Sequence, residues 1–261
     1  MKKFLVIGNP IKHSLSPKLH NYWIKQNKIN AVYDKKLLKE NEIEEIINEV
    51  KNDKIHGINV TVPFKKSVIP FLDLLTPKAI MTQSVNTISK EGDVVVGDNT
   101  DIDGFDLSLK HINFNPKNKK ILILGAGGVV PSLILSLKKS GASRIIISNR
   151  TKKNAEDLKK IHHELEIIEW GTTTTEFDMI INATSLGLKN SDKIDLDFNK
   201  IGKGKLFYDL IYNPDKTNFL LKGQELGNKI ENGKMMFIYQ AQLAFKIWHN
   251  ILPKISDKLL D

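Results

Sequence analysis

The sequence contains no cysteine, and this absence excludes several classes of protein at once. A chain without thiols has no disulfide scaffold, no thiolate metal site and no cysteine nucleophile. It also lacks any apolar run near the roughly 20 residues that a membrane-spanning helix requires. The first apolar stretch, residues 4–8, stops at Asn9-Pro10 and is too short for the core of a signal peptide. We therefore expect a cytoplasmic protein with no membrane partner and no bound metal.

Arginine is also scarce. Only Arg144 and Arg150 are arginines, so lysine supplies the rest of the 39 basic residues, which outnumber the 30 acidic ones and give a net charge of +9. Proteins that read nucleic acids depend on arginine for bidentate contacts, and the lysines here are scattered among glutamates and asparagines. This pattern indicates a solvated surface and no nucleic-acid partner, although a positive field still attracts anionic substrates or cofactors. The nucleic-acid alternative predicts salt-dependent retention on DNA.

The 261 residues are enough for one large domain or two of ordinary size. Short apolar runs and helical spacings alternate along the chain, as in a mostly parallel sheet covered by helices. The pattern predicts an α/β fold with two domains and a boundary near residues 100–118. Strands are expected at 4–8, 31–38, 58–62, 120–124, 144–148, 179–182 and 206–210, with a hairpin near 91–93. Helices are expected from Ser16-Pro17, over 41–50, from the glycine cluster at 125–128 to about 139, and over 235–252.

The run Gly125-Ala126-Gly127-Gly128 lies between a predicted strand and a predicted helix. Glycines in this position let the backbone approach a pyrophosphate, and the helix N-terminus offers free N–H groups. The third glycine of the dinucleotide fingerprint is replaced by Val130, and Pro131 is tolerated because the first helical turn lacks N–H partners. The alternative interpretation is a simple tight turn. We interpret the run as a Rossmann-type cofactor-binding turn.

The segment Ser148-Asn149-Arg150-Thr151 ends the next predicted strand, where an NAD-binding protein usually carries an acidic residue that binds the ribose hydroxyl. A guanidinium beside short polar side chains would bind a 2′-phosphate, which a carboxylate would repel. The segment therefore predicts NADP as the cofactor. The alternative is an asparagine helix cap followed by an ordinary surface arginine.

The acidic cluster at residues 97–104 resembles a calcium loop only in part. Counting from Asn99, the twelfth position should be a bidentate glutamate and is Lys110, so we exclude calcium binding. Asp101 and Asp103 remain available for helix capping or for catalysis. Ser16, directly before Pro17, is predicted to cap a helix.

A series of short motifs follows the same order as in a known family. They are Ser14-Leu15-Ser16-Pro17, residues 59–65 (NVTVPFK), Val85-Asn86-Thr87, Asn99-Thr100-Asp101, the glycine run at 125–128, Asn149-Arg150-Thr151, Asn182-Ala183-Thr184, residues 208–214 (YDLIYNP) and Gln240-Ala241. Together they resemble the shikimate dehydrogenase family from about residue 4 to residue 253. The resemblance implies NADP-dependent, reversible reduction of 3-dehydroshikimate to shikimate in aromatic amino-acid biosynthesis.

The resemblance also implies an arrangement of domains. It implies a substrate-binding domain at residues 1–101, completed by the C-terminal helix at 237–261. A Rossmann-type NADP-binding domain would occupy residues 102–236, with an active-site cleft between the two domains. Residues 99–118 and 213–233 are plausible hinges, and the state is expected to be a monomer or a homodimer.

The implied catalytic residues are Lys65 and Asp101. Lys65 follows Pro63-Phe64 at a predicted helix start, where the helix dipole disfavours a cation. Asp101, if close, would favour the cation, so the sequence leaves the net effect on the lysine open. The implied substrate-binding residues are Ser14, Ser16, Thr61, Lys65, Asn86, Asp101, Tyr212 and Gln240. The implied cofactor-binding residues are Gly125, Ala126, Gly127, Gly128, Val129, Asn149, Arg150, Thr151, Thr184, Leu210 and Gly233.

Some positions depart from the family pattern, and two alternatives remain. Many members carry arginine at Pro131 and a basic residue at Asn154, roles that Lys152 or Lys153 could take over. The first alternative is a quinate/shikimate dehydrogenase with a broader substrate and cofactor range. The second is a non-catalytic NADP-binding regulator on the same fold, since a fold does not determine function.

Overall fold

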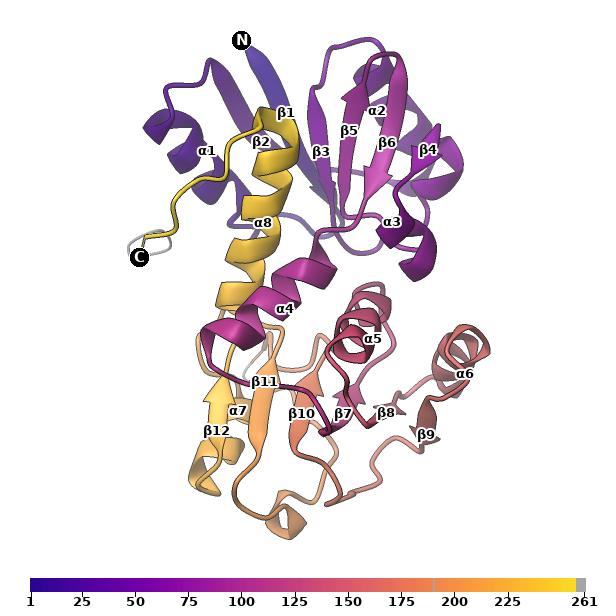
Figure 1. Cartoon of the computed structure of the whole chain (residues 1–261), viewed down its shortest axis with the longest axis vertical. Coiled ribbons are helices and arrows are strands. Elements are labelled where there is room, and N and C mark those ends of the chain that lie inside the picture. Colours follow the sequence, from indigo (N-terminus) through magenta and orange to yellow (C-terminus); the bar gives the residue numbers. More distant parts are fainter. Residues whose placement is uncertain (190, 257–261) are drawn as a thin grey trace. The chain divides into compact units, whose positions relative to one another are not determined.

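The computed structural model describes residues 1–189 and 191–256, and the chain divides into two compact units. The first unit comprises Met1–Gly104 and the chain from Ile238 onward, and the second comprises Phe105–Phe237. Helices α4 (Asp101–His111) and α8 (Lys234–His249) contribute residues to both units. Each unit contains its own sheet with helices packed on it (Figure 1).

The sheet of the first unit has the strand order β2-β1-β3-β5-β6-β4. Strand β1 pairs in parallel with β2 and β3, β5 pairs antiparallel with β3 and β6, and β4 pairs in parallel with β6. The sheet is therefore mixed, with a parallel half and a hairpin half. Its strands are β1 (Lys2–Gly8), β2 (Ala31–Leu37), β3 (Gly57–Val60), β4 (Leu74–Leu75), β5 (Thr87–Glu91) and β6 (Val94–Asp98).

Amphipathic helices cover the first sheet. In α2 (Ile43–Lys51) the buried residues Ile43, Ile46, Ile47 and Val50 follow the helical period and form one apolar face. That face packs in a cluster with Ile58 and other buried strand residues. The other helical segments of this unit are α1 (Ser16–Gln26), α3 (Pro77–Thr82) and the short 3₁₀ turns η1 (Glu40–Glu42) and η2 (Ile69–Phe71).

Helix α8 returns to the first sheet and is held there by Trp248. The indole Nε1 of Trp248 donates a hydrogen bond to the carbonyl of Ile88 at 3.0 Å. Gly57 lies under the same indole, and a Cβ at that position would come within 2.3 Å of Trp248. The helix ends at His249 because Asn250 adopts a left-handed φ of 53° and its N–H bonds to the carbonyl of Lys246 at 2.8 Å. The helix expected over 235–252, and over 237–261 from the resemblance, is therefore shorter at its C-terminal end, and residues 257–261 lie outside the described residues.

The sheet of the second unit is entirely parallel, in the order β12-β11-β10-β7-β8-β9. Counted within the unit, this is the 3-2-1-4-5-6 order of a Rossmann fold read from its other edge, with the reversal between β7 and β10. Ligands of such sheets bind beyond the carboxyl ends of the strands at that reversal. The strands are β7 (Lys120–Leu124), β8 (Arg144–Ser148), β9 (Glu166–Ile168), β10 (Met179–Asn182), β11 (Leu206–Asp209) and β12 (Lys229–Glu231).

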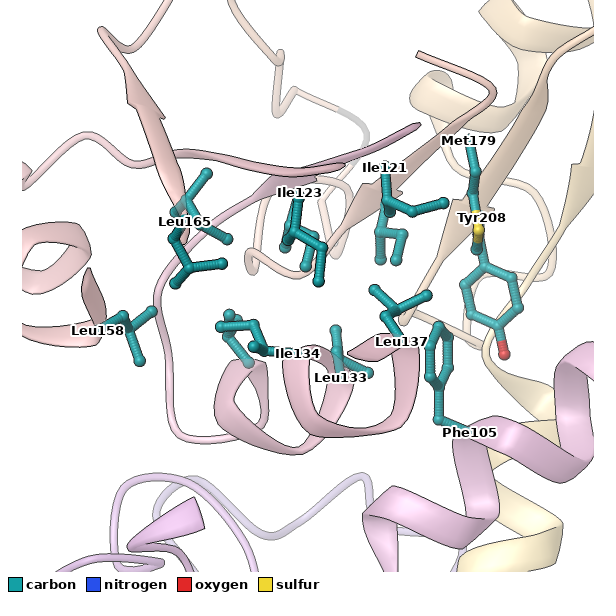
Figure 2. Packing of buried hydrophobic residues seen from close by; sticks show 14 of the residues in the cluster. Phe105, Ile121, Ile123, Leu133, Ile134, Leu137, Leu158, Leu165, Met179 and Tyr208 are labelled. Atoms are coloured by element: carbon teal, nitrogen blue, oxygen red, sulfur yellow. The ribbon is translucent and has the colours of Figure 1, made fainter. Parts of the chain in front are cut away.

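The core of the second unit lies between its sheet and helix α5 (Val130–Lys139). Leu133, Ile134 and Leu137 of α5 point toward Ile121 and Ile123 of β7 (Figure 2). Continuous apolar runs such as that of β7 are typical of strands buried on both faces. The remaining helical segments are α6 (Lys152–Ile161), α7 (Asn218–Glu225) and the 3₁₀ turn η3 (Phe198–Lys200).

The long apolar strands confirm the sequence-based predictions, and the short or polar elements were missed. Strands at 120–124, 144–148 and 179–182 have the expected bounds, and the hairpin turns at Gly92. Helix α6 was missed because it buries only Ala155 and Leu158. Within the described residues no helix is long and apolar enough to cross a membrane, and no cluster of His, Cys, Asp or Glu could hold a metal ion.

Candidate active site

Lys65 and Asp101 form a buried ion pair in the first unit. Lys65 Nζ lies 2.5 Å from Asp101 Oδ2, and their side chains are 10% and 7% exposed. Burying two charges is costly, and an apolar pair of similar volume is often as stable, so such a pair is weak evidence of a stabilising role. The pair is therefore a candidate for a functional cation and its counter-ion.

The backbone around Lys65 differs from the prediction. Residues 62–68 form a series of turns after β3, and no α-helix begins at Lys65. The dipole argument for Lys65 is therefore wrong. The chain turns tightly here instead, with Phe64 N–H bonded to the carbonyl of Thr61 at 3.0 Å, and the carbonyl of Lys65 accepts a hydrogen bond from Val85 N–H at 2.8 Å. Its nearest charged partner is the Asp101 carboxylate.

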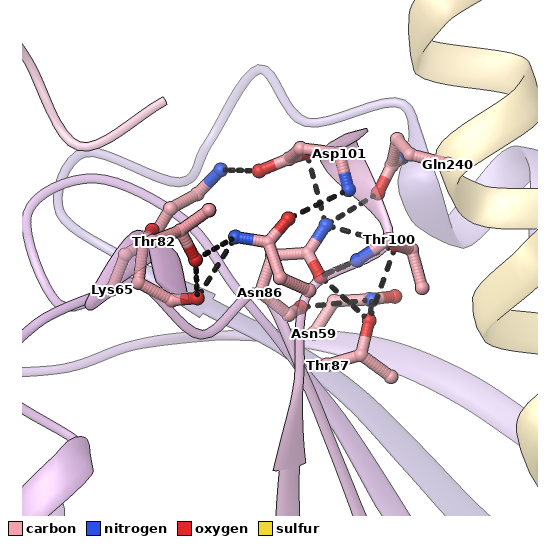
Figure 3. Close-up of polar contacts among 10 residues, drawn as sticks. Asn59, Lys65, Thr82, Asn86, Thr87, Thr100, Asp101 and Gln240 are labelled. Atoms are coloured by element: carbon pink, nitrogen blue, oxygen red, sulfur yellow. Dashed lines mark hydrogen bonds and ion pairs between the residues drawn. The ribbon is translucent and has the colours of Figure 1, made fainter. Parts of the chain in front are cut away.

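Asp101 begins α4 and is fixed by its neighbours (Figure 3). Its N–H donates to Asn99 Oδ1 at 3.0 Å, and Asn99 is anchored by a hydrogen bond from its Nδ2 to the carbonyl of Ser84 at 2.8 Å. Asp101 Oδ1 accepts from Asn86 Nδ2 at 2.9 Å, while Oδ2 accepts from Lys65. With both oxygens accepting, the group is arranged as an ionised carboxylate.

Asn86 is the most connected side chain of this cluster. Its Nδ2 also donates to Thr100 Oγ1 at 2.9 Å and lies 3.4 Å from Gln240 Oε1 on α8. Its Oδ1 accepts from Thr100 N–H at 2.8 Å and from Thr87 Oγ1 at 3.0 Å. The structure thus brings the expected residues Lys65, Asn86, Asp101 and Gln240 into one network. Sequence reasoning missed Asn99 and Thr100 as supports, although both stand in the motif beside Asp101.

Ser14 and Ser16 lie at the start of α1, but Ser16 does not cap the helix as expected. The N-cap residue is Leu15, with no side-chain cap, and Ser16 is already helical. Ser14 Oγ accepts from Ser16 N–H at 3.3 Å, and the Ser16 hydroxyl bonds to the phenol of Tyr33. A hydroxyl must precede the helix to reach its free N–H groups, so Ser14 takes part of that role.

Thr61 and Tyr212 are the remaining residues expected to bind ring hydroxyls. Thr61 follows β3, with its N–H bonded to the carbonyl of Ile7 at 2.9 Å and its methyl group against Gly8, where a Cβ would come within 2.5 Å. Tyr212 belongs to the second unit and stacks on Phe237, with ring centroids 4.7 Å apart and planes 25° apart.

In the second unit, the glycine turn connects β7 to α5 as expected. Gly125 has a φ of 113°, and a Cβ there would lie 2.8 Å from the carbonyl oxygen of Ala183, so only glycine fits. Gly127 is exposed, and a Cβ there would meet nothing within 4 Å, so the chain itself gives no reason for that glycine. The N–H groups of Ala126, Gly127 and Val129 bond to none of the described residues. This turn fits a bound phosphate group.

A positively charged segment follows β8. Asn149 Nδ2 donates to the carbonyl of Thr151 at 2.7 Å, and Thr151 is the N-cap residue of α6. Arg150, Lys152 and Lys153 are exposed and make no ion pair with the described residues. No acidic residue stands in the first turn of α6. The segment therefore presents unpaired cations at a helix N-terminus, which favours an anion.

Two buried residues that the sequence did not single out connect the loops after β10 and β11. Asp209 Oδ1 accepts from Asn182 Nδ2 at 3.0 Å and from Ile211 N–H at 2.9 Å, and its Oδ2 accepts from Thr217 at 2.6 Å. Asn182 Oδ1 in turn accepts from the Thr184 hydroxyl at 2.7 Å. Burial raises the pKa of Asp209 to about 6, against the effect of these hydrogen bonds.

This network places Thr184, Leu210 and Gly233. Gly233 N–H donates to the carbonyl of Ile211 at 3.2 Å, and a Cβ on Gly233 would come within 2.1 Å of the Leu210 carbonyl oxygen. The signal for Asn182 and Asp209 was available, because Asn182 ends a predicted buried strand and Asp209 lies within another, and both belong to family motifs.

The comparisons with known proteins agree with this geometry. A family model described as "Shikimate dehydrogenase substrate binding domain" matches residues 6–88, and one described as "Shikimate / quinate 5-dehydrogenase" matches residues 107–196. A shikimate dehydrogenase (NADP(+)) from Pelagibacter ubique is 59% identical over 260 residues, covering 100% of this chain and 98% of that protein. The chain belongs to the shikimate dehydrogenase family.

Solved members of the family share the fold. The shikimate dehydrogenase of Aquifex aeolicus is 37% identical, with a TM-score of 0.90 over 97% of this chain and 94% of that one. The enzyme of Thermus thermophilus, solved in complex with NADP(H) and shikimate, is 29% identical, with a TM-score of 0.89 over 97% and 95% of the two chains. The two-unit α/β architecture of this chain is therefore that of the family.

Proposed function

We propose that the chain is an enzyme that catalyses the NADP-dependent, reversible reduction of 3-dehydroshikimate to shikimate, a step of chorismate and aromatic amino-acid biosynthesis. The observation that carries this proposal is the buried pair of Lys65 and Asp101 within a fixed polar network. The family's NADP-dependent members, such as the relative from Pelagibacter ubique, support the choice of substrate and cofactor. We also propose that it acts in the cytoplasm as a monomer or homodimer.

In this proposal Lys65 is the acid–base residue. NADPH supplies a hydride to the C3 carbonyl carbon when it is bound. The ammonium of Lys65 gives a proton to the carbonyl oxygen, and in the reverse direction the neutral amine removes it. Asp101, 2.5 Å from Nζ, keeps the ammonium in position and accepts a hydrogen bond from a substrate hydroxyl. Asn86, Thr61, Gln240 and Tyr212 would bind further ring hydroxyls.

Ser14 and Ser16 would bind the substrate carboxylate through their hydroxyl groups. Both stand at the start of α1, where free backbone N–H groups favour negative charge. No acidic residue stands in the first turn of this helix. The site would therefore prefer an anionic ring with several hydroxyl groups.

The cofactor would lie on the second unit. The turn from Gly125 through Ala126, Gly127 and Gly128 to Val129 would hold the pyrophosphate, since the exposed backbone at Gly127 leaves room for it. Thr184, Leu210 and Gly233 would lie on the nicotinamide side.

The 2′-phosphate would bind to Arg150 beside Asn149 and Thr151. Pro131 and Asn154 lack the cations that many family members carry, and the unpaired Lys152 and Lys153 would substitute for them. No carboxylate stands at Asn149 to favour a free ribose hydroxyl. These features favour NADP over NAD.

The second candidate is a dehydrogenase that accepts quinate as well as shikimate, because the family model matching residues 107–196 is described for both substrates. The test measures absorbance at the NADPH band with purified protein. Shikimate or quinate is supplied with NADP or NAD, and light scattering gives the oligomeric state. Rapid reduction only with NADP and shikimate supports the first candidate, while comparable rates with quinate or NAD support the second. A folded protein that binds NADPH but turns over neither substrate would contradict both and indicate a regulator.

The role of Lys65 is tested with Lys65→Ala, and Lys66→Ala is the matched control because Lys66 is its exposed neighbour. Losing a general acid–base group typically costs about 10²- to 10⁴-fold in rate, so we expect kcat to fall by that amount for Lys65→Ala only. Turnover near that of the wild type in a folded Lys65→Ala protein would refute the assignment.

A further inference from the structure

Tyr33 connects two parts of the first unit that carry different proposed roles. It lies on β2 and is 2% exposed. Its hydroxyl donates to Asn59 Oδ1 at 2.7 Å, and it bonds to the hydroxyl of Ser16. Since a phenol has a single proton and Asn59 Oδ1 can only accept, the Ser16 hydroxyl must be the donor to Tyr33. Tyr33 thus accepts a hydrogen bond from Ser16 at the start of α1 and donates one to Asn59 on β3.

From Asn59 the hydrogen bonds continue to the proposed catalytic pair (Figure 3). Asn59 Nδ2 donates to Thr87 Oγ1 at 3.3 Å, and Thr87 donates to Asn86 Oδ1 at 3.0 Å. Asn86 Nδ2 then donates to Asp101 Oδ1 at 2.9 Å. Every donor faces the same way, from Ser16 toward Asp101, and hydrogen bonds aligned in this manner polarise one another.

The direction of these hydrogen bonds requires that Tyr33 stays neutral and that its ring keeps one orientation. Burial raises the pKa of Tyr33 well above its usual value, so the phenol keeps its proton. The ring of His20 stacks on that of Tyr33 with centroids 4.2 Å apart and planes 3° apart. Neither ring nitrogen of His20 has a partner within the part of the chain that the structure describes. His20 therefore holds the Tyr33 ring without competing for its hydroxyl.

The Ser16 hydroxyl has one proton and therefore donates only one hydrogen bond at a time. If Ser16 donates to a substrate carboxylate, it can no longer donate to Tyr33, and the Tyr33 oxygen then needs another donor or must redirect its own proton. Redirecting that proton to Ser16 removes the donor from Asn59 Oδ1. Binding at the serine end therefore changes the hydrogen bonding of Asn59, which also donates to the carbonyl of Asn86 at 3.1 Å.

We propose that Tyr33 is a positioning residue that couples recognition of the substrate carboxylate by Ser16 to the placement of Asn86 and Asp101 around the ring hydroxyls. This inference rests on the proposed function, since it assigns the carboxylate to the serine end. No contact between Tyr33 and the substrate is required, because it acts through Ser16 and Asn59.

Tyr33→Phe tests the proposal, because it removes the hydroxyl and keeps the ring that stacks on His20. The matched control is Tyr208→Phe, since Tyr208 is also fully buried and its hydroxyl bonds to Ser108 at 2.8 Å in the second unit. The dissociation constant for shikimate, from calorimetry, and the KM values for shikimate and NADP are measured for each variant. Calorimetry detects binding without turnover, so a failure of the proposed reaction stays distinguishable from a failure of this inference.

We expect Tyr33→Phe to raise the dissociation constant and KM for shikimate about tenfold and to leave the KM for NADP within twofold of the wild type. Tyr208→Phe should leave the dissociation constant and the KM for shikimate within twofold of the wild type. Both variants lose buried hydrogen bonds, since Tyr33→Phe removes those to Asn59 and Ser16 and Tyr208→Phe removes the one to Ser108. An unchanged dissociation constant for shikimate in Tyr33→Phe, or the same change in both variants, would overturn the proposal.

The coupling itself is tested with Ser16→Ala and the double variant of Ser16 and Tyr33. If Tyr33 acts through Ser16, adding Tyr33→Phe to Ser16→Ala should weaken shikimate binding by less than threefold further. The ratio of the dissociation constant for the uncharged methyl ester of shikimate to that for shikimate should also be larger in the wild type than in Tyr33→Phe. Effects of the two substitutions that multiply fully, or an equal preference in both proteins, would show that the two residues act independently and would overturn the proposal.

Discussion

Replacing His20 with phenylalanine should make the protein more resistant to acid. His20 is 1% exposed, stacks on the ring of Tyr33 and meets the ring of Trp23 edge-on. Burial lowers its pKa to about 3, because the imidazolium has no solvent around it, and nearby His249 lowers it further. Phenylalanine keeps a flat ring on Tyr33 and removes the two ring nitrogens that have no described partner.

The size of the effect follows from the difference between the folded and unfolded pKa values. An unfolded histidine titrates near pH 6.5, whereas His20 in the folded protein takes up a proton only near pH 3. Between these values the unfolded chain binds more protons, so stability falls as the pH falls. With a folded pKa of about 3, His20 should lower the free energy of unfolding at pH 4 by about 3 kcal/mol relative to its value at neutral pH.

Urea unfolding followed by tryptophan fluorescence measures this effect, because Trp23 and Trp248 lie with ring centroids 5.7 and 5.5 Å from that of His20. We expect the stability advantage of His20→Phe over the wild type to grow by about 3 kcal/mol between pH 7.5 and pH 4. His13→Gln is the control, since His13 is exposed in the same unit. Parallel stability curves for wild type and His20→Phe would refute the reasoning.

Three further predictions concern the second unit. Arg150→Ala should raise the KM for NADP by about 10- to 100-fold with little change in the KM for NAD, since it removes a charged hydrogen bond to phosphate. Arg144→Ala is the control: it breaks the ion pairs at the start of β8 and should leave the ratio of the KM for NADP to the KM for NAD unchanged. Gly127→Ala should weaken NADPH binding, measured by titration, at least tenfold. Its melting temperature should stay within a degree or so of that of the Gly202→Ala control, because an added Cβ meets nothing within 4 Å at either position. Asp209→Asn should become more stable relative to the wild type as the pH rises. The raised pKa of about 6 means that ionisation of Asp209 costs up to about 3 kcal/mol of unfolding free energy above pH 6. Equal slopes of unfolding free energy against pH in the two proteins would contradict this.

The local pattern of the sequence was sufficient for the buried strands and for the glycine turn. Strand β8 and the apolar face of α5 could be predicted because residues that are close in sequence determine a period and a burial pattern. Gly125 follows the same logic, since a left-handed turn between a strand and a helix requires glycine at that position. The motifs that carry the family resemblance are likewise local runs of residues.

Only the tertiary structure decided how the side chains meet. Lys65 pairs with a carboxylate 36 positions away, and Asn86 reaches Gln240 154 positions away. The prediction that Lys65 starts a helix was wrong because tertiary hydrogen bonds, such as that from Val85 to the Lys65 carbonyl, hold the segment as turns. The role of Tyr33 was likewise invisible in the sequence. Burial and hydrogen-bond partners depend on which strands lie side by side, and no local period encodes that arrangement.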